Sequence, residues 1–213
     1  MIVMPANSRK GIIHYLAGKY PNKIGHLYNA NDCDNPRFYL PYALDNGVYG
    51  AFTNKYEWDE SKYFRAMEDY WNILGQKAKW ILVPDKVACA ETTFKRWDMY
   101  KDRLRDLGYK TLAFALQDGM TYKDIPKDAD VCFIGGSTEF KWGCYKDVCK
   151  NYPRVHIGRV NMTKDLVLAD KAGAESVDGT GFGRAPENIK RLTDYLDWCE
   201  GKWDYPEQKE LQL

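Results

Sequence analysis

The sequence predicts a compact (β/α)8 barrel of the TIM type, which is an α/β fold. Apolar runs of strand length alternate with amphipathic stretches of helix length, the order expected of a parallel α/β protein. Counted generously, the alternation gives eight units within 213 residues, which is compact against a typical barrel of about 250 residues. A doubly wound open sheet is the rival fold, but no GxGxxG motif follows the first predicted strand.

The second half of the chain has the clearer pattern. Buried strands are predicted at 79–84, 111–117, 130–136, 154–160 and 176–178. Helices, in which apolar residues recur at three- and four-residue steps, are predicted at 91–108, 141–151, 163–173 and 186–199. We expect Thr92 or Thr93 to cap the first of these helices and Gly108 to end it, while Thr163 and Gly173 bound the third.

The first half has a looser pattern. Strands are predicted at 1–6, 26–30 and 37–47, and helices at 9–20 and 59–75. Pro41 weakens the third strand, because proline has no N–H to donate to a sheet. All these elements belong to one predicted domain over residues 1–200, followed by a polar tail, 201–213, that we expect to be frayed.

Composition and charge restrict the class of protein. The chain has 31 Lys and Arg against 30 Asp and Glu, so its net charge of +1 indicates no strong global field for nucleic acid, although a local basic face remains possible. No apolar run reaches the roughly 18 residues of a membrane span, and residues 1–10 lack the apolar core of a signal peptide. The six cysteines form no CxxC pair, which argues against structural zinc and indicates reduced thiols in a cytoplasmic protein.

Polar residues and glycines stand where the predicted strands end: Asp45, Asp85, Gln117, Gly135, Gly136, Arg159, Asn161, Asp178 and Gly179. The carboxyl ends of barrel strands share one rim, and active sites lie there. Three of these residues are aspartates, whose carboxylates would repel one another unless one is protonated or a cation joins them. A cost of this kind indicates a functional site.

Each of these residues also has a purely structural interpretation. Asp45 begins Asp-Asn-Gly, which is a good turn, Asp85 could cap the following segment, and Asp178 could be a plain turn residue. The glycine pair 135–136 could be a tight loop. The stretch "GTGFG" (179–183) could bind a phosphate through its backbone amides, although the preceding carboxylate would repel that anion.

The histidines and one basic run are less informative. We expect His14 and His26 on the surface or in helices. His156 lies within a strand, so the direction of its side chain decides its role. The run 95–105 is expected to be a solvated helix face rather than a nucleic-acid contact.

An ordered set of short motifs resembles the tRNA-guanine transglycosylases. "LDNGVYG" (44–50) is similar to that family's acid/base aspartate block, and "VPDKVA" (83–88) to its base-recognising aspartate. "LAFALQDG" (112–119) resembles its Gln-Gly block and "FIGGST" (133–138) its glycine-pair loop. The run 155–180 is similar to the family's segment that leads to the nucleophilic aspartate.

The resemblance covers roughly residues 40–190. The differences between this chain and the family indicate which branch of the family it resembles. The family's cysteine-rich zinc subdomain has no counterpart here, and the chain is far shorter than a tRNA-modifying member. It is more similar to the compact phage-type enzymes that insert 7-deazaguanines into DNA. The resemblance therefore implies a pentosyltransferase whose partners are guanine-containing DNA and a free 7-deazaguanine base. It implies a cytoplasmic protein, which would act in the host cytoplasm if a phage encodes it. It implies no cofactor, no metal and no membrane, and leaves the oligomeric state open.

The resemblance also implies roles for residues. Asp178 would be the nucleophile on the sugar C1′, and Asp45 the acid/base catalyst. Asp85 would bind the donor edge of the base, with Gln117 and the glycine pair 135–136 on its carbonyl side. Further substrate-binding residues would be Arg159, Asn161 and Gly179. Three alternatives stay open: the same exchange on tRNA, a phosphosugar-handling barrel, and a barrel that binds nucleic acid or a deazapurine without catalysis.

Overall fold

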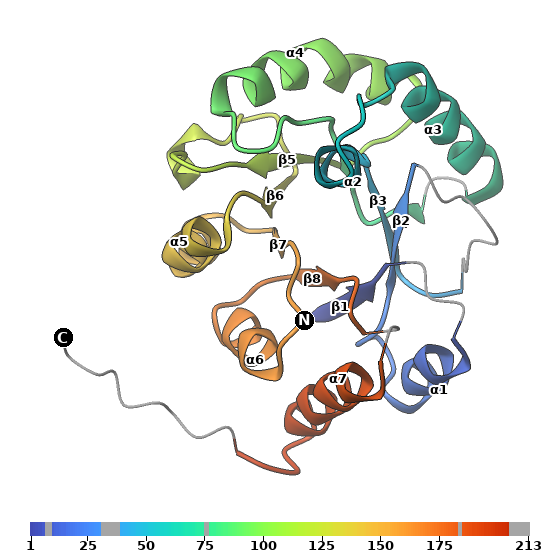
Figure 1. Cartoon of the computed structure of the whole chain (residues 1–213), viewed down its shortest axis with the longest axis vertical. Coiled ribbons are helices and arrows are strands. Elements are labelled where there is room, and N and C mark those ends of the chain that lie inside the picture. Colours follow the sequence, from blue (N-terminus) through green and yellow to red (C-terminus); the bar gives the residue numbers. More distant parts are fainter. Residues whose placement is uncertain (7–9, 31–38, 75–76, 183–184, 205–213) are drawn as a thin grey trace.

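A computed structural model describes residues 1–6, 10–30, 39–74, 77–182 and 185–204. Eight parallel strands form one sheet that curls into a nearly closed barrel (Figure 1). The described part also contains seven α-helices, most of which lie around the outside of the sheet. The predicted fold class, a (β/α)8 TIM-type barrel, is confirmed. Of the predicted polar tail, residues 205–213 lie outside the described residues.

The strands are short, and every pairing between them is parallel. They are β1 (Ile2–Pro5), β2 (His26–Asn29), β3 (Tyr42–Asp45), β4 (Ile81–Leu82), β5 (Leu112–Leu116), β6 (Val131–Ile134), β7 (Val155–Ile157) and β8 (Ser176–Gly179). Their order in the sheet is β1-β8-β7-β6-β5-β4-β3-β2. Two isolated parallel bridges, Val3–Ile24 and Ala6–Leu27, bring β1 against β2 and so close the ring.

The helices are α1 (Gly11–Lys19), α2 (Val48–Thr53), α3 (Glu60–Leu74), α4 (Ala90–Asp106), α5 (Thr138–Asn151), α6 (Thr163–Lys171) and α7 (Pro186–Cys199). The predicted alternation of one strand with one helix is not followed everywhere. Two helices, α2 and α3, separate β3 from β4, and only the short 3₁₀ helix η2 (Tyr122–Asp124) separates β5 from β6. The connection from β2 to β3 contains no helix in its described residues, since 31–38 lie outside them.

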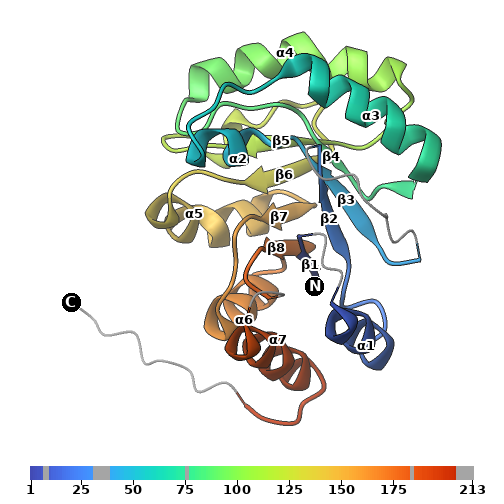
Figure 2. The ribbon, with the colours of Figure 1, turned by 45° about the vertical axis from the view of Figure 1, so that its right-hand side comes forward.

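Helix α2 was not predicted, and it lies close to the site described below. It follows β3 directly and therefore begins at the carboxyl end of the barrel. In both views it lies inside the outer layer formed by α3 and α4, over one end of the barrel (Figures 1 and 2). Its six residues fall below the length that an amphipathic pattern can reveal, which explains why periodicity missed it.

Several predicted boundaries shift, each for a local reason. Helix α4 begins at Ala90 and not at a threonine cap, because the Thr93 hydroxyl donates to the carbonyl groups of Lys86 and Cys89. Helix α5 begins three residues earlier than predicted, because the Ser137 hydroxyl accepts a hydrogen bond from the Phe140 N–H. The predicted C-terminal glycines are confirmed, since Gly108 and Gly173 have φ angles of +103° and +89° just past their helices.

Two predicted strands are much shorter than expected. The strand predicted at 37–47 forms only over Tyr42–Asp45, directly after Pro41, and residues 37–38 lie outside the described residues. The Pro41 carbonyl still accepts a hydrogen bond from His26 N–H, so the proline stands at the start of the ladder rather than within it. The strand predicted at 79–84 pairs only over Ile81–Leu82.

The barrel interior is apolar at its base and polar toward the carboxyl ends of the strands. Its apolar part consists of Met4, Leu27, Ala43, Trp80, Leu82, Ala113, Ala115 and Val131, with Ile2 and Phe133 packed against them. The ring of His156 packs on Phe133 and Trp80 of this cluster, and its nitrogen atoms contact Ser176 and Asp178. Polar residues of β7 and β8 therefore continue the interior stack toward the rim. None of the described helices combines the length and apolarity needed to cross a bilayer.

Candidate active site

The carboxyl ends of the strands bring the three predicted aspartates together. Asp45 is the last residue of β3, Asp85 follows β4, and Asp178 is the last residue but one of β8. Burial raises the pKa of Asp45 to about 7, and the negative charges of Asp178 and Asp85 raise it further in the same direction. The three carboxylates are therefore close enough to interact electrostatically across the barrel mouth.

Asp178 is 5% exposed, and both of its carboxylate oxygens accept hydrogen bonds. Its Oδ2 lies 3.0 Å from His156 Nε2, and its Oδ1 accepts from the Arg159 N–H at 3.1 Å. These two hydrogen bonds fix the direction of the carboxylate. Gly158 leaves the necessary room, because a Cβ at this position would lie 3.4 Å from Asp178 Oδ2 and 2.9 Å from Phe133 Cζ.

His156 supports Asp178 from inside the barrel. The imidazole is fully buried and stacks on Phe133, with 4.9 Å between ring centroids. Its Nδ1 lies 2.8 Å from the Ser176 hydroxyl. When that hydroxyl donates to Nδ1, the proton of the neutral ring is on Nε2, where it donates to Asp178. The sequence left the role of His156 open, although its position between the outward-facing apolar residues Val155 and Ile157 was a usable signal.

Asp45 has a different environment. It is partly buried, and its Oδ2 accepts a hydrogen bond from Asn29 Nδ2 at 3.2 Å, across the β2–β3 register in which these two residues are partners. The backbone N–H groups of Asn46 and Gly47 lower its pKa, but burial and the neighbouring charges outweigh them and hold it at about 7. At neutral pH, Asp45 is therefore divided between acid and base forms.

Asp85 is held by two amide side chains. Asn46 Nδ2 donates to its Oδ1 at 2.8 Å, and Gln117 Nε2 donates to its Oδ2 at 2.5 Å. Burial raises the pKa of Asp85, and the hydrogen bonds from Asn46, from its own backbone and from Gln117, together with the charge of Arg96, partly oppose that rise. Asn46 was not predicted as a site residue. It also accepts from the Val48 N–H at the start of α2, so it connects this helix to Asp85.

Gln117 and Gly135 are placed differently from their expected contacts with a base. The Gln117 amide donates to Asp85 and accepts from the Ala88 N–H at 3.1 Å, so it positions Asp85. The Gly135 N–H donates to the Leu116 carbonyl at 3.0 Å and is not free for a substrate carbonyl. A Cβ at 135 would stand 3.2 Å from Gln117 Nε2, which explains the glycine.

Arg159 follows β7 and contacts several parts of the rim. Its φ of +58° lies in the left-handed region, which is uncommon for a residue with a side chain, and its N–H donates to Asp178 in this conformation. Its guanidinium donates to the Gly136 carbonyl and lies 4.5 Å above the ring of Tyr49 on α2. Gly136 also has a left-handed backbone, with φ of +64°.

Lys141 of α5 is a buried lysine that sequence analysis missed. It is 2% exposed, and its Nζ donates to the carbonyl groups of Gly158 and Arg159 at 2.7 and 3.2 Å. Burial lowers its pKa to about 8, aided by the charge of Arg159 and opposed by those of Asp178 and Asp165. Lys141 therefore braces the segment that presents the Arg159 N–H to Asp178.

The glycine loop after Asp178 packs on Asn161. Asn161 Oδ1 accepts from the Gly181 N–H at 3.0 Å. A Cβ at Gly179 would lie 2.5 to 2.7 Å from Phe182 Cε2, the Val160 carbonyl and Asn161 Oδ1. These glycines are thus required by contacts within the protein, and one loop amide that could hold a phosphate is already bonded. Gly183 lies outside the described residues.

The other two histidines of the chain are His14 and His26. His14 lies in α1 as expected, with Nδ1 2.9 Å from the Tyr39 hydroxyl. The expectation for His26 was wrong, because this residue is in β2 and fully buried. Within the described residues, no group of three His, Cys, Asp or Glu side chains is arranged to hold a metal ion.

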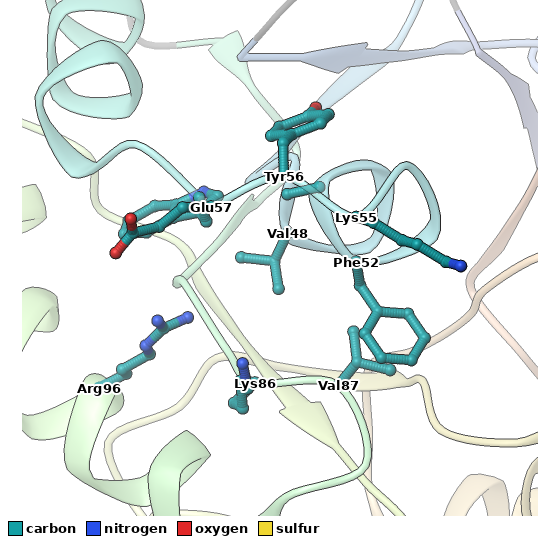
Figure 3. A pocket seen from close by; sticks show the side chains of 10 residues that line it. Val48, Phe52, Lys55, Tyr56, Glu57, Lys86, Val87 and Arg96 are labelled. Atoms are coloured by element: carbon teal, nitrogen blue, oxygen red, sulfur yellow. The ribbon is translucent and has the colours of Figure 1, made fainter.

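Two pockets lie beside Asp85 on the α2 side of the rim. The first, of about 330 Å³, is lined by Val48, Ala51, Phe52, Lys55, Tyr56, Glu57, Trp58, Lys86, Val87 and Arg96 (Figure 3). The second, of about 460 Å³, shares the 56–58 wall and also contacts Asn46 and Tyr63. The linings of these two pockets include neither Asp45 nor Asp178.

Comparison of the chain with protein-family models and with curated proteins finds no match.

Proposed function

We propose that the protein is a base-exchange transglycosylase that replaces guanine in DNA with a 7-deazaguanine derivative through a covalent aspartyl–sugar intermediate. One observation carries the proposal. Asp178 is oriented by two hydrogen bonds, one with His156 and one from the Arg159 N–H, while the neighbouring Asp45 has a pKa of about 7. Two neighbouring carboxylates in different environments are the arrangement that a nucleophile and an acid/base catalyst require.

In the first step, a carboxylate oxygen of Asp178 attacks the sugar C1′, and the bond from C1′ to the guanine nitrogen breaks. The electron pair of that bond leaves with the base, which takes a proton from the acid form of Asp45. In the second step, the carboxylate form of Asp45 removes a proton from the incoming 7-deazaguanine. The base nitrogen then attacks C1′ and releases Asp178. Two displacements retain the configuration at C1′.

Asp85 supports recognition of the base. Its two oxygens are directed by Asn46 and Gln117, and each has further lone-pair capacity for the N–H donors of a guanine-type edge. Adenine lacks that donor pattern and would leave the remaining lone pairs of the buried carboxylate without donors, which predicts steep discrimination. In a duplex, the target nucleotide must first be flipped out of the stack.

The glycine loop gives less support to a phosphosugar-handling enzyme. A phosphate grip needs free backbone amides at a helix N-terminus. Here the Gly181 N–H bonds to Asn161 and the Asp178 carboxylate precedes the loop, so the local charge and the available donors both disfavour an anion.

The test is incorporation of labelled guanine into a guanine-containing DNA oligonucleotide. We expect the wild-type protein to incorporate label and Asp178→Asn to lose it, because the amide cannot form the ester intermediate. An exposed control, Lys146→Gln on α5, should retain full exchange. The same assay with tRNA in place of DNA shows which polymer is the substrate. An assay with a small phosphosugar tests the alternative of a phosphosugar-handling enzyme. Undiminished incorporation by the Asp178→Asn variant would remove this residue from the proposed role.

A further inference from the structure

Exposed aromatic side chains are concentrated at the rim beside α2. Tyr49, Phe52 and Tyr56 are 42%, 57% and 50% exposed, and they follow one another at steps of three and four residues. The first two therefore lie on one face of α2, and the third lies three residues beyond the helix end at Thr53. We call these three residues the aromatic strip. A row of large exposed rings at an active-site rim indicates a surface that a partner covers.

Cations stand at both ends of the aromatic strip. At one end, the Arg159 guanidinium lies over the Tyr49 ring and its N–H contacts the proposed nucleophile. At the other end, Lys55, Lys86 and Arg96 line the 330 Å³ pocket together with Phe52 and Tyr56. Figure 3 shows the side-chain nitrogens of Lys86 and Arg96 directed toward the hollow, opposite α2. We call this hollow the basic pocket.

The basic pocket adjoins Asp85. Lys86 is the next residue in the chain, and the Arg96 guanidinium donates to the Asp85 carbonyl while it lies 5.1 Å from the Trp58 ring centroid. Glu57 supplies the one acidic side chain among the described residues that line this pocket, against three basic ones. The chain as a whole carries a net charge of only +1, so this local excess of positive charge stands out.

We propose that the aromatic strip and the basic pocket bind a single strand of nucleic acid next to its reacting nucleotide. Bases would stack on the exposed rings, and the phosphodiester backbone would run past Lys55, Lys86 and Arg96. Interleaved cations and aromatic rings are the means by which proteins hold single strands without sequence preference. The pocket volume also falls in the range of small-ligand sites, which suits a single nucleotide. This inference rests on the proposed function, because it assigns the polymer-binding surface of that same site.

The test is binding of a fluorescent, guanine-free oligo-dT of about twelve nucleotides, measured by anisotropy at several salt concentrations. Thymine cannot enter the exchange, so binding is measured without chemistry. Each lost phosphate contact lowers the salt slope for a single strand by about 0.7, so Lys55→Gln with Lys86→Gln should lower it by about 1.4. The matched exposed control Lys146→Gln should leave affinity and slope unchanged.

Two further variants separate stacking from charge. Phe52→Ser should weaken binding on the order of tenfold without changing the salt slope, because it removes a stacking surface and no charge. Met99→Ser, at a residue on α4 that is 64% exposed, is its control and should have no effect. Glu57→Gln should tighten binding, since it removes the acid from the pocket lining.

Three results would overturn the inference. They are wild-type binding by the Lys55 and Lys86 double variant, tighter binding of a duplex than of the single strand, and equal competition by polyglutamate. Failure of the proposed function is distinguishable. If oligo-dT binds as described but labelled guanine is never exchanged, the strand-binding surface is supported and the proposed base exchange is contradicted. If exchange occurs while the double variant binds oligo-dT normally, the base exchange is supported and the strand-binding surface is contradicted.

Discussion

Asp45 and Asp178 have the same side chain, and the barrel gives them different chemistry. Asp178 is hydrogen-bonded to the His156 imidazole and the Arg159 N–H, which fix the direction of its carboxylate. Asp45 is desolvated by burial and lies in the field of two other carboxylates, so its pKa rises to about 7 despite the hydrogen bonds from the backbone N–H groups of Asn46 and Gly47. The difference comes from neighbours contributed by other strands and loops, which no residue-by-residue inspection of a sequence contains.

The raised pKa of Asp45 predicts a pH dependence of stability. A carboxyl group with a folded pKa of about 7 and an ordinary unfolded value of 3.8 stabilises the fold below about pH 4, and that contribution is lost as the pH rises to about 7. The loss is on the order of 4 kcal/mol, since a tenfold change in proton affinity is worth about 1.4 kcal/mol. Asp45→Asn should therefore unfold at higher urea concentration than wild type at pH 8, and at a similar concentration at pH 4. Equal shifts at both pH values would contradict this origin.

His156 can be tested separately from Asp178. His156→Phe should retain the packing on Phe133 and Trp80 while it removes the donor to the carboxylate. We expect base exchange to slow by about one to two orders of magnitude, which is the usual effect of losing an orienting partner. Ser176→Ala, which removes only the hydroxyl next to Nδ1, should have a smaller effect on the rate. An unchanged rate in His156→Phe would show that the imidazole has no part in orienting the nucleophile.

At the scale of elements, the segments after β7 and β8 depend on close packing. Gly158 gives space to Phe133 and Asp178, and Gly179 gives space to Asn161 and Phe182. Lys141 of α5 donates hydrogen bonds to the carbonyl groups of Gly158 and Arg159 and so holds the segment after β7. The site geometry is therefore a property of how α5 and the loop segments fit the strand ends.

This packing predicts opposite effects for two glycine substitutions. Gly179→Ala should destabilise the protein by about 1 to 3 kcal/mol, because its Cβ would lie 2.5 to 2.7 Å from three atoms, one of them a backbone carbonyl. Gly143→Ala in α5 should instead stabilise it by about 0.5 to 1 kcal/mol, because no atom lies within 4 Å of the added Cβ and alanine favours helix. Chemical denaturation of both variants measures the contrast. A neutral Gly179→Ala would mean that the loop relaxes without cost.

The strand ends were the predictable part of the site, because a barrel places them on one rim whatever their sequence separation. The elements of the second half were also predictable, since hydrophobic periodicity is strong there. Lys141 and Asn46 were not, because one is a lysine in a helix and the other a turn residue, and only the tertiary contacts give them their roles. Helix α2 is too short to show a period, and the two-residue β4 is defined by its neighbours.

At the scale of the whole molecule, neighbouring strands of the barrel are paired over different lengths. Strands β5 and β6 share a four-pair register, whereas β1 and β2 meet only through two isolated bridges and a few hydrogen bonds around Val3. The β1–β2 seam lies away from the proposed nucleophile's supports, although β1 itself pairs with β8. The β1–β2 seam is therefore expected to open more readily than the β5–β6 pair.

Hydrogen exchange measures that expectation. Amides at the seam, Val3 and Gly25, should exchange at least tenfold faster than Phe114 of β5 and Cys132 of β6, because fewer contacts must break to expose them. The Cys132 N–H donates to the Arg154 carbonyl just before β7. Amide-resolved exchange at neutral pH provides the comparison. Equal protection at both places would indicate that the barrel opens only as one cooperative unit.

The central claim is that Asp178 becomes bonded to a sugar. Its most direct measurement is the intact mass of the wild-type protein quenched during turnover on a guanine-containing oligonucleotide, followed by peptide mapping of the adduct. The account predicts a species heavier by the oligonucleotide without one guanine, attached at Asp178 and missing in Asp178→Asn. An adduct on another residue, or an identical adduct in that variant, would contradict it.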